Sequence, residues 1–96
     1  MTEEQKLQYI VGQYSLENRQ NQLMEEMAEL TQAILKLRRI DIKNNESAWK
    51  NYIEEVVDVQ LCLDMIKIFL KDYKPEMQDI REWKINRQIE RIQTKL

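Results

Sequence analysis

The stretch from residue 51 to residue 70, NYIEEVVDVQLCLDMIKIFL, most constrains the fold of this chain. At about 100° per residue it forms one helix in which Gln60, Asp64 and Lys67 share a narrow polar sector. Glu55 and Asp58 point to the opposite side, which is otherwise apolar. An unpaired buried carboxylate is costly, so such groups become protonated, pair with a cation or bind a metal. The stretch therefore predicts a long, largely covered helix that carries a polar site.

Composition excludes several fold and function classes. Glycine and proline occur once each, which disfavours sandwiches and barrels because their turns need both residues. The single glycine, Gly12, also excludes a P-loop and a dinucleotide-binding fingerprint. Histidine is absent, so the usual zinc sites, the usual general base and Ser-His-Asp triads are excluded.

Net charge, hydropathy and chain length predict the class of partner, the location and the oligomeric state of the protein. The net charge of −2 argues against a nucleic-acid-binding surface, and no apolar run is long enough to span a membrane. The N-terminus is too polar for a signal peptide, and one cysteine, Cys62, permits no intramolecular disulfide, so we expect a cytoplasmic protein. A chain of 96 residues buries only about 60–65% of its unfolded surface alone, so we expect a homodimer or homotetramer.

Helical patterns with short links cover the chain, which is expected to form one domain, residues 1–96. Thr2 is expected to cap a short first helix, with Gln5 completing a capping box, and Ser15 to cap a second helix over residues 16–39. A third helix is expected over about residues 47–72, ended by Lys74 because the residue before a proline avoids the helical region. The apolar stripe of the second helix consists of Leu16, Leu23, Met27, Leu30, Ile34 and Leu37.

The fold class that follows is all-α. Two long helices joined by a short link form an antiparallel helix hairpin with short flanking helices, the last of which begins near Pro75. Two such hairpins, from two chains, would close a four-helix bundle.

Four acidic residues are expected to form a metal site. Glu26 and Glu29 are three residues apart on the second helix, and Glu55 and Asp58 have the same spacing on the third, so each pair shares a helix face. Antiparallel packing can bring the two pairs together around a divalent cation. Carboxylate ligands suit Mg²⁺, with Mn²⁺ possible, rather than zinc or copper. The alternative for Glu26 and Glu29 is a solvated helix surface, because such pairs are common there.

The segments ENRQNQLMEEMAELTQAILKLRR and NYIEEVVDVQLCLDMI resemble the MazG-like, all-α nucleoside triphosphate pyrophosphohydrolases. The pattern of that family is EExxE, a gap of variable length and then ExxD, and the resemblance extends over about residues 17–96. One departure is Val57, where many members have alanine beside the ExxD aspartate.

The resemblance implies a Mg²⁺-dependent enzyme that hydrolyses a nucleoside triphosphate, often a non-standard one, to the monophosphate and pyrophosphate. It also implies a role for each acidic residue of the pattern. The metal ligands would be Glu26, Glu29, Glu55 and Asp58. Glu25 would be a catalytic residue that orients water.

Three further residues are candidates for substrate contacts. Lys84 and Arg87 could offset the charge of the triphosphate, although they could equally form a solvated basic row on the last helix. Asn51 could hydrogen-bond to the substrate or to water at the metal, or could be an ordinary first-turn residue.

Two other functions stay open at this stage. One is a phosphoribosyl-ATP pyrophosphohydrolase-like enzyme, which shares the architecture and the acidic motif. The other is a non-catalytic helical dimerisation or regulatory module. All five acidic positions of the pattern are filled here, which argues against a degenerate site.

Overall fold

The computed structural model describes residues 1–39 and 45–95, and within them it contains helices and no strand. This confirms the all-α fold class. The predicted link over residues 40–46 lies largely outside the described residues. In chain order the elements are α1 (Glu3–Val11), α2 (Leu16–Arg39), α3 (Glu46–Phe69), a 3₁₀ turn η2 (Lys71–Tyr73) and α4 (Lys74–Lys95).

The beginnings of α1 and α2 confirm the predicted caps. The Thr2 hydroxyl accepts from the backbone N–H of Gln5 at 3.1 Å, and the Gln5 side chain accepts from the N–H of Thr2 at 2.9 Å. This reciprocal pair is a complete capping box. The Ser15 hydroxyl accepts from the N–H of Asn18 at 3.0 Å, which satisfies one free donor at the start of α2.

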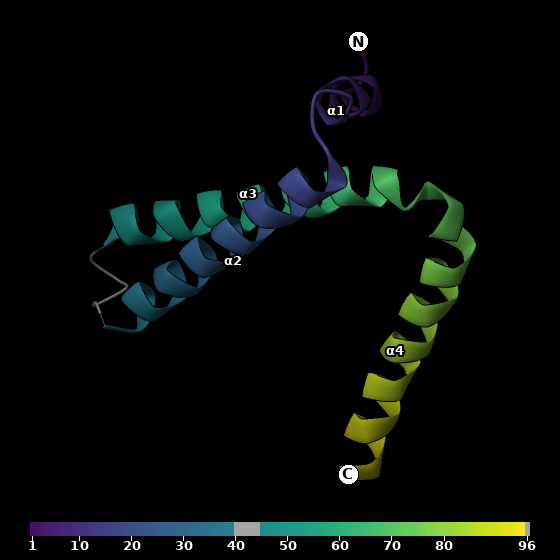
Figure 1. Ribbon diagram of the computed structural model, residues 1–96. Helices are drawn as coiled ribbons and strands as arrows, with labels where there is room; N and C mark the ends of the chain where they lie inside the picture. The colour runs from purple at the N-terminus through teal and green to yellow at the C-terminus, as the bar shows by residue number, and fades with distance from the viewer. Residues whose placement is uncertain (40–44, 96) are drawn as a thin grey trace.

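The two long helices form an antiparallel hairpin, and α1 packs against α3 near its C-terminal half (Figure 1). The core of this arrangement is small. No side chain in the described part of the chain is both large and fully buried. The buried hydrophobic residues are Val11 of α1, Ala33 and Leu37 of α2, and Ala48, Cys62 and Met65 of α3.

The predicted boundary between α3 and α4 is wrong. The third helix ends at Phe69 rather than near Asp72, and a 3₁₀ turn follows it. Lys74 has φ −54° and ψ −46°, so it is helical although it precedes Pro75. A proline in the first turn removes an N–H that needs no partner there, so α4 can begin one residue before it.

The prediction that both flanking helices are short is confirmed for α1, which has 9 residues, and is wrong for α4. The last helix, α4, has 22 residues, almost as many as the 24 of α2 or α3. It extends away from the hairpin (Figure 1) and buries none of its described residues. Trp83 on this helix is 58% exposed in the single chain.

The chain is extended for its size. Its radius of gyration is 17.2 Å, whereas a compact domain of this length has about 13 Å. Its accessible surface of 8265 Å² exceeds by about 2,400 Å² that of a typical folded monomer of the same mass. None of the helices in the described residues combines the length and the apolar character needed to cross a membrane.

The start of α3 provides a test of this local structure. The side chain of Asn45 accepts from the N–H of Ala48 at 2.9 Å, so Asn45→Ala should destabilise the fold by about 1 kcal/mol, measured by urea denaturation. Asn45→Asp is the matched control because it keeps an accepting oxygen at the helix N-terminus. Equal losses in both variants would show that the cap does not stabilise α3.

Candidate metal centre

Three carboxylates converge between α2 and α3. Glu26 and Glu29 come from α2, where their spacing places them on one helix face, and Glu55 comes from α3. One carboxylate oxygen from each lies within 4.8 Å of the other two. The antiparallel packing of the hairpin therefore brings together three of the four residues that the sequence predicts as metal ligands.

Two of these carboxylates have an oxygen without a partner. Glu26 and Glu55 are half-buried, and in each the Oε2 atom is buried and has no hydrogen-bond partner. An ionised carboxylate can only accept, so a partner for these oxygens must be a donor or a cation. A set of closely spaced, hard oxygen atoms fits Mg²⁺ or Mn²⁺ by its chemistry.

A glutamine holds one carboxylate oxygen of Glu26 in place. The side-chain amide of Gln22 donates to Oε1 of Glu26 at 2.7 Å, which leaves Oε2 as the unpartnered oxygen. Gln22 was not among the predicted site residues. Its spacing of four residues from Glu26 on one helix is the signal that could have identified it. Gln22 is therefore a positioning residue for this carboxylate.

The electrostatics of the cluster act most strongly on Glu55. Partial burial raises the pKa of Glu55 above its ordinary value of 4.5, and the negative charges of Glu29, Asp58 and Glu26 raise it further. A hydrogen bond between the side chains of Glu55 and Glu29 acts in the same direction. The cluster without a cation therefore favours a proton on Glu55, and a cation would favour its ionised form.

The only cysteine, Cys62, is buried near the cluster but is not among the groups that converge there. Burial raises the pKa of the Cys62 thiol, and the charge of Glu26 raises it further, while Arg19 partly offsets this. A neutral thiol is a poor metal ligand. Cys62 therefore acts as a small core residue next to the carboxylates.

Asp58 and Glu25 lie outside the converged group. Asp58 is exposed, so the prediction that it lies on a buried face is wrong for the single chain. The reason is that α1 and α2 cover only part of the surface of α3. The charge of Asp58 still reaches Glu55. Glu25 is exposed as well, beside Glu26 on α2.

The predicted substrate-contacting residues are divided between two places. Asn51 is half-buried on α3, four residues before Glu55 and on the same helix face. Lys84 and Arg87 are exposed on α4, which extends away from the hairpin (Figure 1), so a single chain does not bring them to the carboxylates. The Arg87 guanidinium lies over the Trp83 ring, 5.1 Å from its centroid.

Comparison of the chain with protein-family models, with curated proteins and with solved structures finds no match.

The raised pKa of Glu55 predicts how stability depends on pH in a metal-free buffer. The folded state binds a proton at Glu55 more tightly than the unfolded chain does. Its contribution to stability is therefore present below the ordinary pKa of 4.5 and is lost as pH rises through the raised folded value. Glu55→Gln should make the protein more stable than wild type at about pH 8, with the difference shrinking near about pH 4.

Urea denaturation in the presence of a chelator would measure this difference. Glu54→Gln is the matched control, because it removes a charge from the neighbouring exposed residue and should leave the pH profile unchanged. If the free energy of unfolding changes with pH in the same way in wild type and in Glu55→Gln, the electrostatic description of the cluster is contradicted.

Proposed function

We propose that the protein is a Mg²⁺-dependent nucleoside triphosphate pyrophosphohydrolase that acts in the cytoplasm. The observation that supports this most directly is the convergence of Glu26, Glu29 and Glu55, with two buried oxygens that have no partner. The resemblance of the EExxE and ExxD segments to MazG-like enzymes adds the reaction class. In this reaction water adds to the α-phosphorus, the bond to the bridging oxygen breaks, and pyrophosphate leaves with the monophosphate as the other product.

The acidic residues divide into two roles in this proposal. Glu26, Glu29 and Glu55 hold the cation, and Asp58 completes the set from the next turn of α3. Mg²⁺ bound there would supply neutralisation of phosphate charge and activation of water. Glu25 is the catalytic residue that orients the attacking water. Because the chain has no histidine, a carboxylate of the acidic set takes the place of the usual general base.

The substrate is positioned by residues outside the cluster. Asn51 hydrogen-bonds to the nucleotide or to water in the site, since it shares a face of α3 with Glu55. Lys84 and Arg87 offset the charge of the triphosphate. Their distance from the carboxylates in one chain favours an assembly in which α4 of one protomer reaches the cluster of another.

We propose that the assembly is a homodimer or homotetramer in which two hairpins close a four-helix bundle. The exposed apolar residues support this arrangement, because they lie on both α3 and α4. They include Ile53, Val57, Leu63, Ile80, Trp83, Ile89 and Ile92. The surface in excess of a typical monomer, about 2,400 Å² per chain, is in the range that obligate interfaces bury.

Removal of one carboxylate should abolish the reaction. Glu55→Gln or Asp58→Asn should lower pyrophosphate release from nucleoside triphosphates with Mg²⁺ by at least about a hundredfold, because each removes a metal ligand. The measurement is a release assay across canonical, deoxy and modified triphosphates. Glu54→Gln and Asp72→Asn, which remove charges from exposed residues outside the cluster, are the controls.

Metal binding provides a second readout of the same variants. Saturating Mg²⁺ should raise the stability of wild type by about 2.7 kcal/mol at one hundred times the dissociation constant, and this increase should be small in Glu55→Gln. Unchanged turnover in Glu55→Gln and Asp58→Asn would overturn the proposed enzyme. A thermal unfolding midpoint that is the same with and without Mg²⁺ would show that the carboxylates do not form a cation site.

The oligomeric state can be measured directly. Light scattering after size exclusion should give at least twice the protomer mass of 11.7 kDa at micromolar concentration. The thermal midpoint should rise with protein concentration, because association stabilises the folded state by mass action. A stable monomer whose midpoint is independent of concentration would contradict the proposed bundle.

A further inference from the structure

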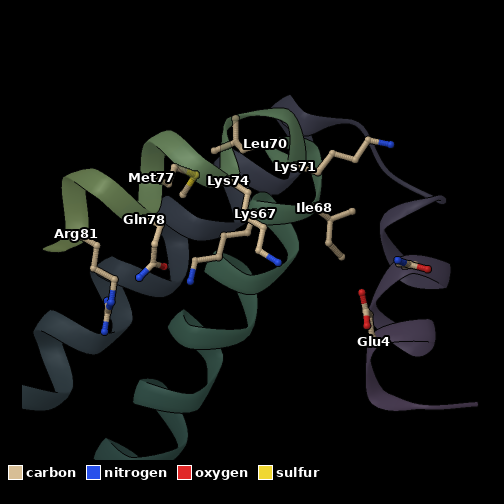
Figure 2. Close-up of a pocket in the computed structure, with 10 residues that line it drawn as sticks. Glu4, Lys67, Ile68, Leu70, Lys71, Lys74, Met77, Gln78 and Arg81 are labelled. Carbon is tan, nitrogen blue, oxygen red and sulfur yellow. The ribbon is translucent and has the colours of Figure 1, made fainter.

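A basic hollow lies at the C-terminal end of α3, between α1, the end of α3 and the beginning of α4 (Figure 2). Its volume is about 510 Å³, which is the size of a small-molecule site. Lys67 follows Glu55 by twelve residues, so the hollow is about 18 Å along α3 from the carboxylates. It is therefore separate from the candidate metal centre.

Cations outnumber acids around this hollow. Four of the described residues that line it are cationic and one, Glu4, is acidic, although the chain as a whole has a net charge of −2. In Figure 2 the side chains of Lys67, Lys74 and Arg81 extend in the same direction from α3 and α4, with Glu4 across from them on α1. Lys71 extends another way, at the rim.

The helix dipoles of α3 and α4 account for the positions of some of these cations but not of all of them. Lys67 lies in the last turn of α3, where positive charge is favourable beside free carbonyl groups, and Lys71 begins the 3₁₀ turn that follows. Lys74 is the first residue of α4, where the helix dipole favours negative charge instead, whereas Arg81 lies beyond the first turn in which that dipole acts. Cations at that end of a helix repel its dipole, and a bound anion would relieve the repulsion.

Part of the lining of the hollow is apolar. Ile68, Leu70 and Met77 line it beside the cations, and Met77 is the half-buried residue among the described residues of α4. The grouped cations Lys67, Lys74 and Arg81 suit an anion with several charges, because such an anion can contact more than one of them at once. A single carboxylate would leave most of them unpaired.

We propose that this hollow is a binding site for an oligophosphate anion, either free or as the phosphate tail of a nucleotide. Lys67, Lys74 and Arg81 contact the phosphate oxygens, and the side chain of Gln78 donates a further hydrogen bond from the same face of α4. Glu4 opposes binding by repulsion. The site does not rest on the proposed enzymatic function, and it requires no divalent cation.

Calorimetry with inorganic tripolyphosphate and the full chain, in a chelator and at about 50 mM salt, tests this site. The chelator leaves the carboxylate cluster without a cation, so binding there is unfavourable. Lys67→Gln, Lys74→Gln and Arg81→Gln should each weaken binding by about threefold to fivefold, and the pair Lys67→Gln and Lys74→Gln by about tenfold or more. Glu4→Gln should strengthen it by a similar factor.

Matched controls distinguish specific binding in the hollow from non-specific attraction between the anion and the charges of the protein. Lys95→Gln on α4 and Glu3→Gln on α1 remove the same charges from residues that do not line the hollow, and neither should change the affinity. Glu55→Gln should also leave it unchanged, which separates this result from any failure of the proposed enzyme. Circular dichroism would verify that each variant keeps its helix content.

A parallel titration with ATP distinguishes the two sources of phosphate. Equal affinities indicate that only phosphate is recognised, whereas tighter binding of ATP indicates that the apolar part of the lining contacts a nucleoside; either result supports the site. The proposal is overturned if tripolyphosphate does not bind, if Lys95→Gln weakens binding as much as Lys67→Gln does, or if only Lys84→Gln and Arg87→Gln weaken it. It is also overturned if the substitutions at Lys67 and Lys74 change the oligomeric state without changing the affinity.

Discussion

The packing of α2 against α3 is the interaction on which the rest of this structure depends. It is made by small side chains at two of its most buried positions, Ala33 and Ala48, which are each 3% exposed. Small residues let two helices approach closely, and the close approach places side chains at the edges of the interface within reach of one another. The convergence of Glu26 and Glu29 with Glu55 follows from this approach, because neither helix alone holds all three carboxylates.

That convergence has an energetic cost in the folded chain. Partial burial and three nearby negative charges raise the pKa of Glu55, so the ionised form of this group works against folding. The small core offers little to offset such a cost, since no described side chain is both large and fully buried. Sites that destabilise the fold until a ligand binds are typical of functional clusters. The unpartnered oxygens of Glu26 and Glu55 are consistent with this behaviour.

The second constraint is the small amount of surface that one chain buries. The apolar stripe of α2 illustrates it: Leu37 is buried, but Met27 is 51% exposed on the same helix. The last helix has no buried residue at all and extends away from the hairpin (Figure 1). Exposed apolar surface of this extent is typical of chains that complete their core with another subunit. In the single chain the cations of α4 and the carboxylates of the hairpin, which the proposed reaction needs together, lie apart (Figure 1).

The sequence by itself determined the local structure. The caps at Thr2 and Ser15 and the bounds of α2 could be predicted, because capping and the 3.6-residue period depend on residues close together in the chain. The spacing of Glu26 from Glu29 likewise placed them on one face. The tertiary structure decided which carboxylates meet and that Asp58 remains exposed. It also decided the direction of α4 (Figure 1). These features depend on how helices pack and on how much of each face is covered, which the period of a single helix does not specify.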